Sequence, residues 1–147
     1  DEINALGGNI QNAYGISLAE LKEAITYGIN KINVDTDIRL AVTRNMKELF
    51  AGYPELRESP SIGGVYQLLE NNKDQFDPRV FLPPVMDTVM YGNIPDGDVA
   101  RLMECVEKGV KEAVGTLIVQ FGAYGKAPLV KRPSLEEMKE YYKNEGK

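Results

Sequence analysis

The N-terminal third of the chain alternates between helical and extended patterns of apolar positions. Ser17, followed three residues later by Glu20, forms a capping box, which predicts the start of a helix. Gly28 suits the position just past the end of that helix. Residues 29–35 then alternate apolar and polar side chains, which predicts a short strand. The predicted buried face of the first helix consists of Leu18, Leu21, Ala24 and Ile25.

A second helix is predicted directly after the strand. Thr36 or Asp37 can cap it, and apolar positions at helical spacing continue from Ile38 to Phe50. The order helix, strand, helix leaves one strand without a neighbour, and a lone strand with apolar side chains requires partners to form a sheet. The pattern therefore indicates the last βα unit of a larger α/β fold.

The rest of the chain is predicted to be helical. Residues 52–72 are rich in Pro, Ser and Gly around a short helix at Val65–Glu70, and we expect this stretch to be an excursion from the core. A turn at 95–97 precedes a long helix over Asp98–Phe121, and a second capping box at Ser134–Glu137 begins a charged tail helix. A helical extension thus follows the βα unit.

Composition argues against several classes of partner. The chain has 147 residues, of which 43% are hydrophobic and 27% are charged, as in an ordinary globular domain. Its net charge of −5 and its pI near 4.9 argue against nucleic acid and anionic membrane surfaces, which attract basic patches. No apolar run approaches the roughly 20 residues that span a bilayer, and no charged-then-apolar leader is found, so we expect a cytoplasmic protein.

Two residue types limit the chemistry that this chain can perform. Cys105 is the only cysteine, so no internal disulfide can form, and we expect it to be a small core residue. The sequence contains no histidine, which excludes a Ser-His-Asp triad, a Cys-His pair and His-bound zinc within this chain. Any catalysis must use Asp, Glu, Lys, Tyr, Arg or Asn.

The end of the predicted strand is the best candidate site. Alternation puts Asn33 and Asp35 on the face opposite Val34, at the carboxyl end of the strand, where parallel α/β folds bind ligands. The following helix offers its first backbone amides to an anion such as phosphate, with the Thr36 hydroxyl and the Arg39 guanidinium within one turn. Because a carboxylate repels phosphate, we expect Asp35 to turn its oxygens towards backbone amides, Arg or Lys.

Each of these residues also has a purely structural interpretation. Asp37 suits a helix cap, Asn33 suits the polar end of a strand, and Arg79, just after Asp-Pro at a helix start, suits a surface ion pair. The glycines of residues 122–126 follow a helix and lack the spacing of a phosphate loop. Spacing alone favours the structural interpretation.

Three ordered motifs change this balance. Residues Tyr27–Thr43, Phe76–Arg79 and Phe121–Ala127 together resemble the C-terminal part of class II fructose-bisphosphate aldolases. The resemblance implies an α/β fold, namely the C-terminal portion of a TIM (β/α)8 barrel, with residues 29–35 as its last strand, plus a helical C-terminal extension. The single segment 1–147 then divides into the last βα unit (1–50), an insertion (51–75) and the helical extension (76–147).

The resemblance also implies an activity and a role for each site residue. Class II aldolases cleave fructose 1,6-bisphosphate reversibly to dihydroxyacetone phosphate and glyceraldehyde 3-phosphate, in glycolysis and gluconeogenesis, and use a divalent metal, usually zinc. Asn33 would help to hold the enediolate that forms in this reaction. Asp35 and Thr36 would bind the dihydroxyacetone-phosphate end of the sugar. Arg39 would contact the phosphate at the other end, and Arg79 would reach that phosphate from a neighbouring subunit.

The metal ligands of the family lie upstream of this chain, so we expect no metal site within it. We expect the phosphate-binding half of the site here, completed in a homo-oligomer by a companion polypeptide that carries the N-terminal part of the barrel. Two alternatives remain open. A relative acting on tagatose 1,6-bisphosphate differs in how it reads one hydroxyl group, and a non-catalytic interaction or regulatory subunit would keep the phosphate site alone.

Overall fold

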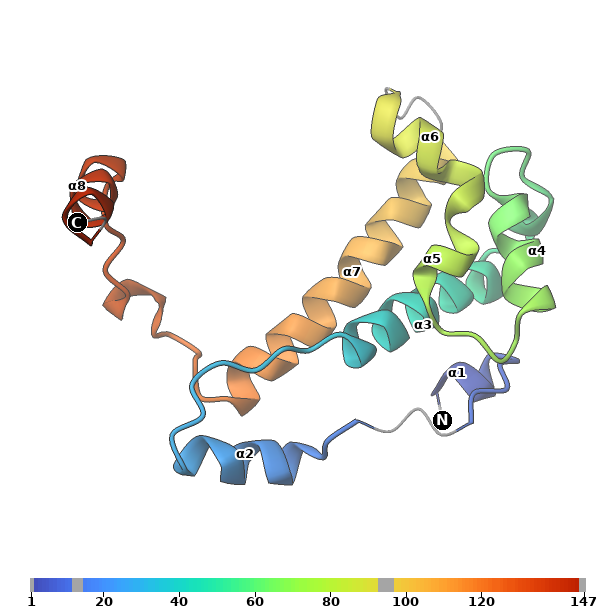
Figure 1. Cartoon of the computed structure of the whole chain (residues 1–147). Helices are drawn as coiled ribbons and strands as arrows, with labels where there is room; N and C mark the ends of the chain where they lie inside the picture. The colour runs from blue at the N-terminus through green and yellow to red at the C-terminus, as the bar shows by residue number, and fades with distance from the viewer. Residues whose placement is uncertain (1, 12–14, 93–96, 146–147) are drawn as a thin grey trace.

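The computed structural model describes residues 2–11, 15–92 and 97–145, and within these ranges it contains helices and no strand. Figure 1 shows the long helices α3 and α7 crossing at the centre, with α4, α5 and α6 beside them and α8 set apart. In chain order the elements are α1 (Glu2–Ala5), α2 (Leu18–Thr26), α3 (Thr36–Gly52), η1 (Pro54–Glu58), α4 (Gly63–Asn71), α5 (Pro78–Phe81), α6 (Pro83–Tyr91), α7 (Gly97–Gln120), η2 (Ala127–Leu129) and α8 (Leu135–Glu145).

The core forms where α3 packs along α7, the most extensive contact between two described elements. Gly109 of α7 lies directly against the α3 backbone. A Cβ atom at this position would stand 2.7 Å from the Cα of Val42 and 2.8 Å from the carbonyl oxygen of Ala41. A residue without a side chain therefore permits the close crossing of the two helices. The buried side chains at this contact are Val42, Met46, Leu49, Phe50, Val99 and Leu102.

The stretch that we expected to be an excursion from the core is instead part of it. Its buried members, together with those of the next two helices, are Leu56, Ile62, Val65, Leu69, Phe81 and Val85. The short helix predicted at Val65–Glu70 is confirmed as α4. The prediction was wrong because Pro54 does not interrupt a helix here: it stands at the first position of η1, where the missing N–H costs nothing, and apolar side chains of η1 and α4 are buried. The division into residues 1–50, 51–75 and 76–147 remains a prediction.

The strand predicted over residues 29–35 is not formed. This segment runs as a coil from α2 to α3 (Figure 1). From Lys31 to Asp35 the side chains keep the expected alternation, because Ile32 and Val34 are half-buried whereas Lys31, Asn33 and Asp35 are exposed. Ile29 at the start of the segment is exposed. A strand is held by hydrogen bonds to a neighbouring strand, and the described ranges contain none. The segment thus has the pattern of a strand and lacks the partner that would make it one.

The local signals for helix ends are confirmed. The Ser17 hydroxyl accepts a hydrogen bond from the Glu20 amide at 3.3 Å, and the Glu20 carboxylate accepts one from the Ser17 amide at 2.9 Å. The second capping box has the same pair of bonds across Ser134–Glu137 at the start of α8. Gly28, just past α2, has a φ of +95°, which glycine adopts readily. Short-range hydrogen bonds therefore follow from sequence alone.

The start of α3 differs from the prediction, and part of the predicted turn before α7 lies outside the described ranges. The N-cap of α3 is Asp35, and Thr36 and Asp37 lie within the first turn, so the helix begins earlier than predicted. The helix dipole favours an acidic residue in the first turn of a helix. Asp37 therefore stabilises the start of α3 from within the first turn, although it is not the N-cap. The long helix α7 is confirmed, whereas residues 95 and 96 of the predicted turn before it lie outside the described ranges.

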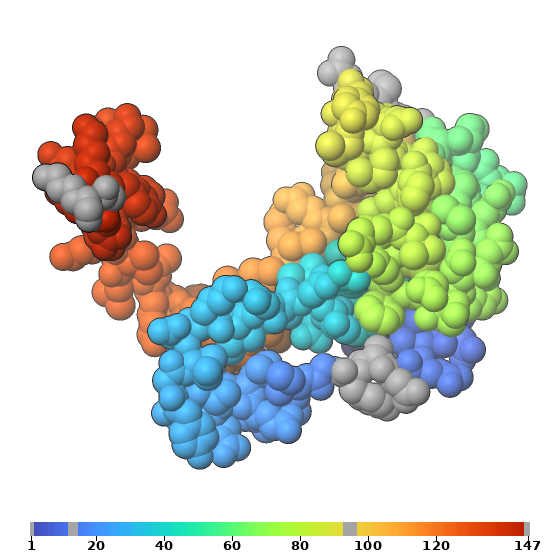
Figure 2. Space-filling view, viewed as in Figure 1, coloured from blue at the N-terminus to red at the C-terminus, as the bar shows by residue number. Residues whose placement is uncertain are grey.

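Helices α2 and α8 are the least buried helices of the described chain. None of the residues in α2 or α8 is buried, so the predicted core face of α2 is at most half-buried. Figure 2 shows open space between α8 and the helices α6 and α7.

Cys105 is half-buried beside the core, where burial raises the pKa of its thiol. Within the described ranges, no helix combines the length and apolar character needed to cross a membrane.

Candidate functional site

The first turn of α3 places Arg39 against Asp35. The Arg39 Nε donates to Asp35 Oδ1 at 2.8 Å, and its Nη2 pairs with the other carboxylate oxygen. The two residues are four apart on one helix, a spacing that brings side chains together. The Asp35 carboxylate is therefore turned towards an arginine, one of the partners that we expected, and makes no capping bond to the backbone amides of the helix.

Asp77 and Arg79 form a second ion pair at the start of α5. Asp77 is the N-cap of this short helix, and its Oδ1 accepts a hydrogen bond from the Arg79 backbone amide at 3.0 Å. The Arg79 Nε donates to both carboxylate oxygens at 3.0 Å, and its Nη2 also binds Oδ2. Pro78 holds the turn between them in a helical conformation. The Asp77 carboxylate is thus held by backbone and side chain alike.

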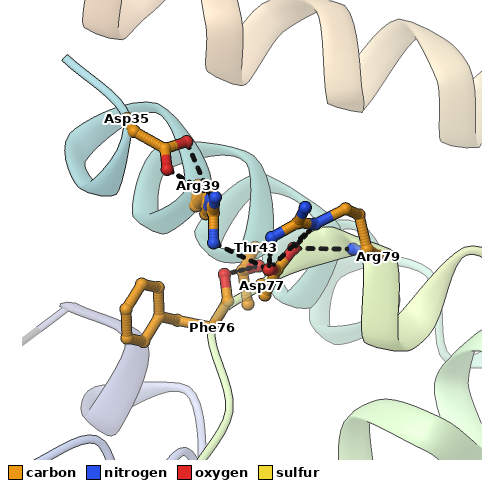
Figure 3. Close-up of polar contacts among 6 residues, drawn as sticks. All are labelled: Asp35, Arg39, Thr43, Phe76, Asp77 and Arg79. Atoms are coloured by element: carbon orange, nitrogen blue, oxygen red, sulfur yellow. Dashed lines mark hydrogen bonds and ion pairs between the residues drawn. The ribbon is translucent and has the colours of Figure 1, made fainter. Parts of the chain in front are cut away.

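The two ion pairs meet in one cluster, shown in Figure 3. The Arg39 Nη1 donates to Asp77 Oδ2 at 2.7 Å, so both arginines bind the same carboxylate. One turn further along α3, the buried Thr43 donates its hydroxyl hydrogen to the Phe76 carbonyl at 2.9 Å. This bond fixes the residue before Asp77 to the face of α3 that carries Arg39. We name Asp35, Arg39, Asp77 and Arg79 the arginine–carboxylate cluster.

We expect Thr43→Val to weaken this attachment and lower the free energy of unfolding by about 1–2 kcal/mol, since it leaves the Phe76 carbonyl without its donor. Urea unfolding followed by circular dichroism measures the change. Thr116→Val on α7 is the control, because that hydroxyl is exposed and has no hydrogen-bond partner within the described ranges. Equal midpoints for the two variants would contradict the role given to Thr43.

The electrostatics of the cluster follow from these contacts. The pKa of Asp77 falls from 3.8 to about 2, chiefly because the Arg79 side chain donates hydrogen bonds to it, with help from the Arg79 amide and from Arg39. The same pair raises the pKa of Arg79. Two carboxylates and two guanidiniums sum to zero charge. The cluster therefore has no net formal charge of its own.

The structure brings together three of the five predicted site residues. Asp35, Arg39 and Arg79 join through Asp77, which the sequence did not single out. Arg79 binds a carboxylate of its own chain, and its predicted reach into a neighbouring subunit remains a prediction. Two predicted residues lie outside these contacts. Asn33 is exposed in the preceding coil, where its Oδ1 accepts a hydrogen bond from Lys31 Nζ at 2.5 Å, and Thr36 is half-buried in the first turn of α3.

A cavity of about 600 Å3 lies between α1, α2, α3 and α7, separate from the cluster. Its polar wall includes Arg44 and Glu112, which pair with each other, and Asn45 behind them donates to Glu112 at 2.8 Å. None of the predicted site residues lines it. The bonds from Arg44 and Asn45 to Glu112 join α3 to α7 at this cavity.

Comparison with known proteins identifies the family. The family model described as fructose-bisphosphate aldolase class-II matches residues 10–126, which include every predicted site residue. No solved structure matches the chain. A fructose-bisphosphate aldolase of Xanthobacter flavus is 29% identical over 142 residues, which cover 97% of this chain and 29% of that protein. One of Giardia intestinalis is 31% identical over 143 residues, covering 97% of this chain and 32% of that protein.

A shorter relative adds to this comparison. Fructose-bisphosphate aldolase 2 of Rhodobacter capsulatus is 33% identical over 89 residues, which cover 60% of this chain and 61% of that protein. The chain spans a third or less of the Xanthobacter and Giardia proteins. The family match covers most of its length and all three motifs up to residue 126. The chain therefore belongs to the class II fructose-bisphosphate aldolase family.

Proposed function

We propose that this chain supplies the phosphate-binding half of the active site of a fructose-1,6-bisphosphate aldolase, which cleaves its substrate reversibly to dihydroxyacetone phosphate and glyceraldehyde 3-phosphate. The observation that carries the proposal is that Arg39 and Arg79, from different helices, meet at one carboxylate. Guanidinium groups bind phosphate oxygens through paired N–H donors. One of them in the first turn of α3 and another in α5 favour phosphate groups as ligands.

The N-terminus of α3 supports a second phosphate contact. Asp35 caps this helix without a side-chain capping bond, so its carboxylate does not satisfy the amides of the first turn. Such amides have no intrahelical partner and carry partial positive charge. In the proposal, the backbone of Asp35 and Thr36 and the Thr36 hydroxyl bind the phosphate at the dihydroxyacetone end of the sugar. Arg39 binds the phosphate at the opposite end, and Arg79 reaches that phosphate from a neighbouring subunit.

The zinc, or other divalent metal, of the family does not fit the residues of this chain. The sequence contains no histidine. Among residues 2–11, 15–92 and 97–145, no three His, Cys, Asp or Glu side chains are grouped to hold a metal ion. In the proposal, the metal is therefore bound by a companion polypeptide that completes the barrel. The alternating segment 29–35 would pair with that polypeptide as the last barrel strand, within a cytoplasmic homo-oligomer.

The test is to purify the protein from its natural source and to measure intact mass, metal content and cleavage of fructose 1,6-bisphosphate in one sample. We expect cleavage that a chelator abolishes and that added zinc restores. We also expect histidine-containing polypeptide in the same particle. A metal-free protein that cleaves no sugar bisphosphate would refute the proposal. Parallel assays with tagatose 1,6-bisphosphate decide which of the two sugars is the substrate.

A further inference from the structure

Lys47 of α3 is a buried lysine whose amine has no close partner. Its side chain is 4% exposed, and among the described residues its Nζ makes no hydrogen bond. Glu70 Oε1 of α4 lies 3.9 Å from this nitrogen, which is within the range of an ion pair and too far for a hydrogen bond. A buried cation without a close partner destabilises the structure around it.

The carboxylate of Glu70 is shared with a second lysine. Its other oxygen, Oε2, pairs with Lys73 Nζ at 3.2 Å, a shorter distance than the one to Lys47. The side chain of Lys73 is 49% exposed and that of Glu70 is 37% exposed, so water reaches this pair. One carboxylate therefore lies near two amines, and the buried amine is the more distant of the two.

The other elements that pack against α3 turn their charged groups towards other residues of that helix. These contacts, with the partner on α3 named second, are Glu2 with Arg44, Arg57 with the Phe50 carbonyl, Asp77 with Arg39, Lys108 with Glu48, and Glu112 with Arg44. Glu70 and Lys73 are thus the charged groups that act on Lys47.

We infer that Lys47 and Glu70 form a pH-sensitive latch between α3 and α4, which holds the end of α4 when the Lys47 amine is neutral and loosens it when the amine takes up a proton. A neutral amine needs no counter-ion in a buried position. An ammonium group there must draw Glu70 away from Lys73 or move towards water. This inference does not depend on the proposed function.

The direction of the pH response follows from the two states of the latch. Burial lowers the pKa of Lys47 below its ordinary value of 10.5, while Glu70 opposes this change and Lys73 adds to it. When the end of α4 opens, water reaches the amine and the ordinary pKa returns. The closed state therefore binds fewer protons, and closing becomes more favourable as the pH rises through the lowered pKa. This gain ends near pH 10.5, where the open state also loses its proton.

The first test measures the protonation of Lys47 in the assembled protein, by NMR of isotope-labelled lysine Cε atoms. The signal that is absent from Lys47→Met belongs to this residue. We expect it to titrate below pH 10.5, and at a still lower pH in Glu70→Gln, which removes the carboxylate that favours the ammonium form. A Lys47 signal that titrates at pH 10.5 or above would overturn the inference.

The second test measures the latch itself, through hydrogen exchange of the α4 amides in the same assembled protein. Protection is expressed relative to an unprotected chain at each pH. We expect it to rise at least about threefold between about pH 7 and about pH 10 in the unmodified protein. We expect constant protection in Lys47→Met, because methionine has a similar length and cannot take up a proton.

The matched control is Lys111→Met on α7, whose side chain is 72% exposed. We expect its α4 amides to respond to pH as those of the unmodified protein do. The same pH response in Lys47→Met would contradict the latch. Should Lys47→Met fail to fold, Glu70→Gln takes its place in the exchange measurement. Weaker protection of α4 at neutral pH in that variant would support the inference, and unchanged protection would overturn it.

Discussion

Gly109→Ala is expected to lower the free energy of unfolding by about 2–3 kcal/mol, because overpacking of a core forces the structure to move. The three atoms nearest to the added Cβ would all be backbone atoms, namely the Cα and amide nitrogen of Val42 and the carbonyl oxygen of Ala41, each within 2.8 Å. Backbone atoms in the middle of α3 cannot rotate away as the end of a long side chain can. The two central helices must therefore separate, which loosens the core between them.

The matched control is Gly115→Ala on the same helix. No heavy atom lies within 4 Å of a Cβ at that position, so the substitution meets no obstacle. Alanine is the better helix former, and we expect the control to raise the free energy of unfolding by up to about 1 kcal/mol. Urea unfolding of both variants measures these opposite changes in midpoint. An unchanged or higher midpoint for Gly109→Ala would show that α3 and α7 do not touch at Gly109.

Sequence predicted best those features that depend on neighbours along the chain. The capping box of Ser17 and Glu20, and the glycine in the left-handed region at Gly28, each involve hydrogen bonds or backbone angles within one turn. The bounds of α3 and α7 were found to within two residues for the same reason. Short-range pattern is enough for such features because no distant residue takes part in them.

Features that depend on distant residues could not be predicted. Composition predicted that residues 52–72 leave the core, yet Ile62 and Val65 are completely buried, since burial depends on which helices lie nearby. The strand pattern of residues 29–35 was recognised correctly as a pattern, but a strand needs a partner that the described chain does not contain. Local sequence gives no information about either kind of contact.

The site itself was only partly predictable. We selected Arg39 and Arg79 because they lie in the motifs. The hydrogen bond that brings them together joins Arg39 to Asp77, 38 positions further along the chain. The one signal for Asp77 was the Asp-Pro-Arg run, in which an acidic N-cap precedes a proline and an arginine follows within hydrogen-bonding reach. That signal indicates the ion pair with Arg79. It does not indicate the second arginine, which only the packing of α3 supplies.

Asn33→Ala is expected to lower kcat by about 100-fold, the size of effect seen when one donor to a developing oxyanion is removed. Asn33 Oδ1 accepts a hydrogen bond from Lys31 Nζ, a group that can only donate, so the amide Nδ2 hydrogens point elsewhere. They have no partner among the described residues, and we propose that they donate to the enediolate. Because this bond strengthens as the enediolate forms, we expect KM to change little.

The control is Asn30→Ala, which removes the same side chain from an exposed position of the same coil. We expect its kcat to match that of the unmodified enzyme. Steady-state cleavage of fructose 1,6-bisphosphate by the assembled enzyme measures both variants. An unchanged kcat in Asn33→Ala would remove this residue from the site. Equal losses in both variants would point to the conformation of the coil, because the asparagine at position 30 has no proposed contact with the reacting atoms.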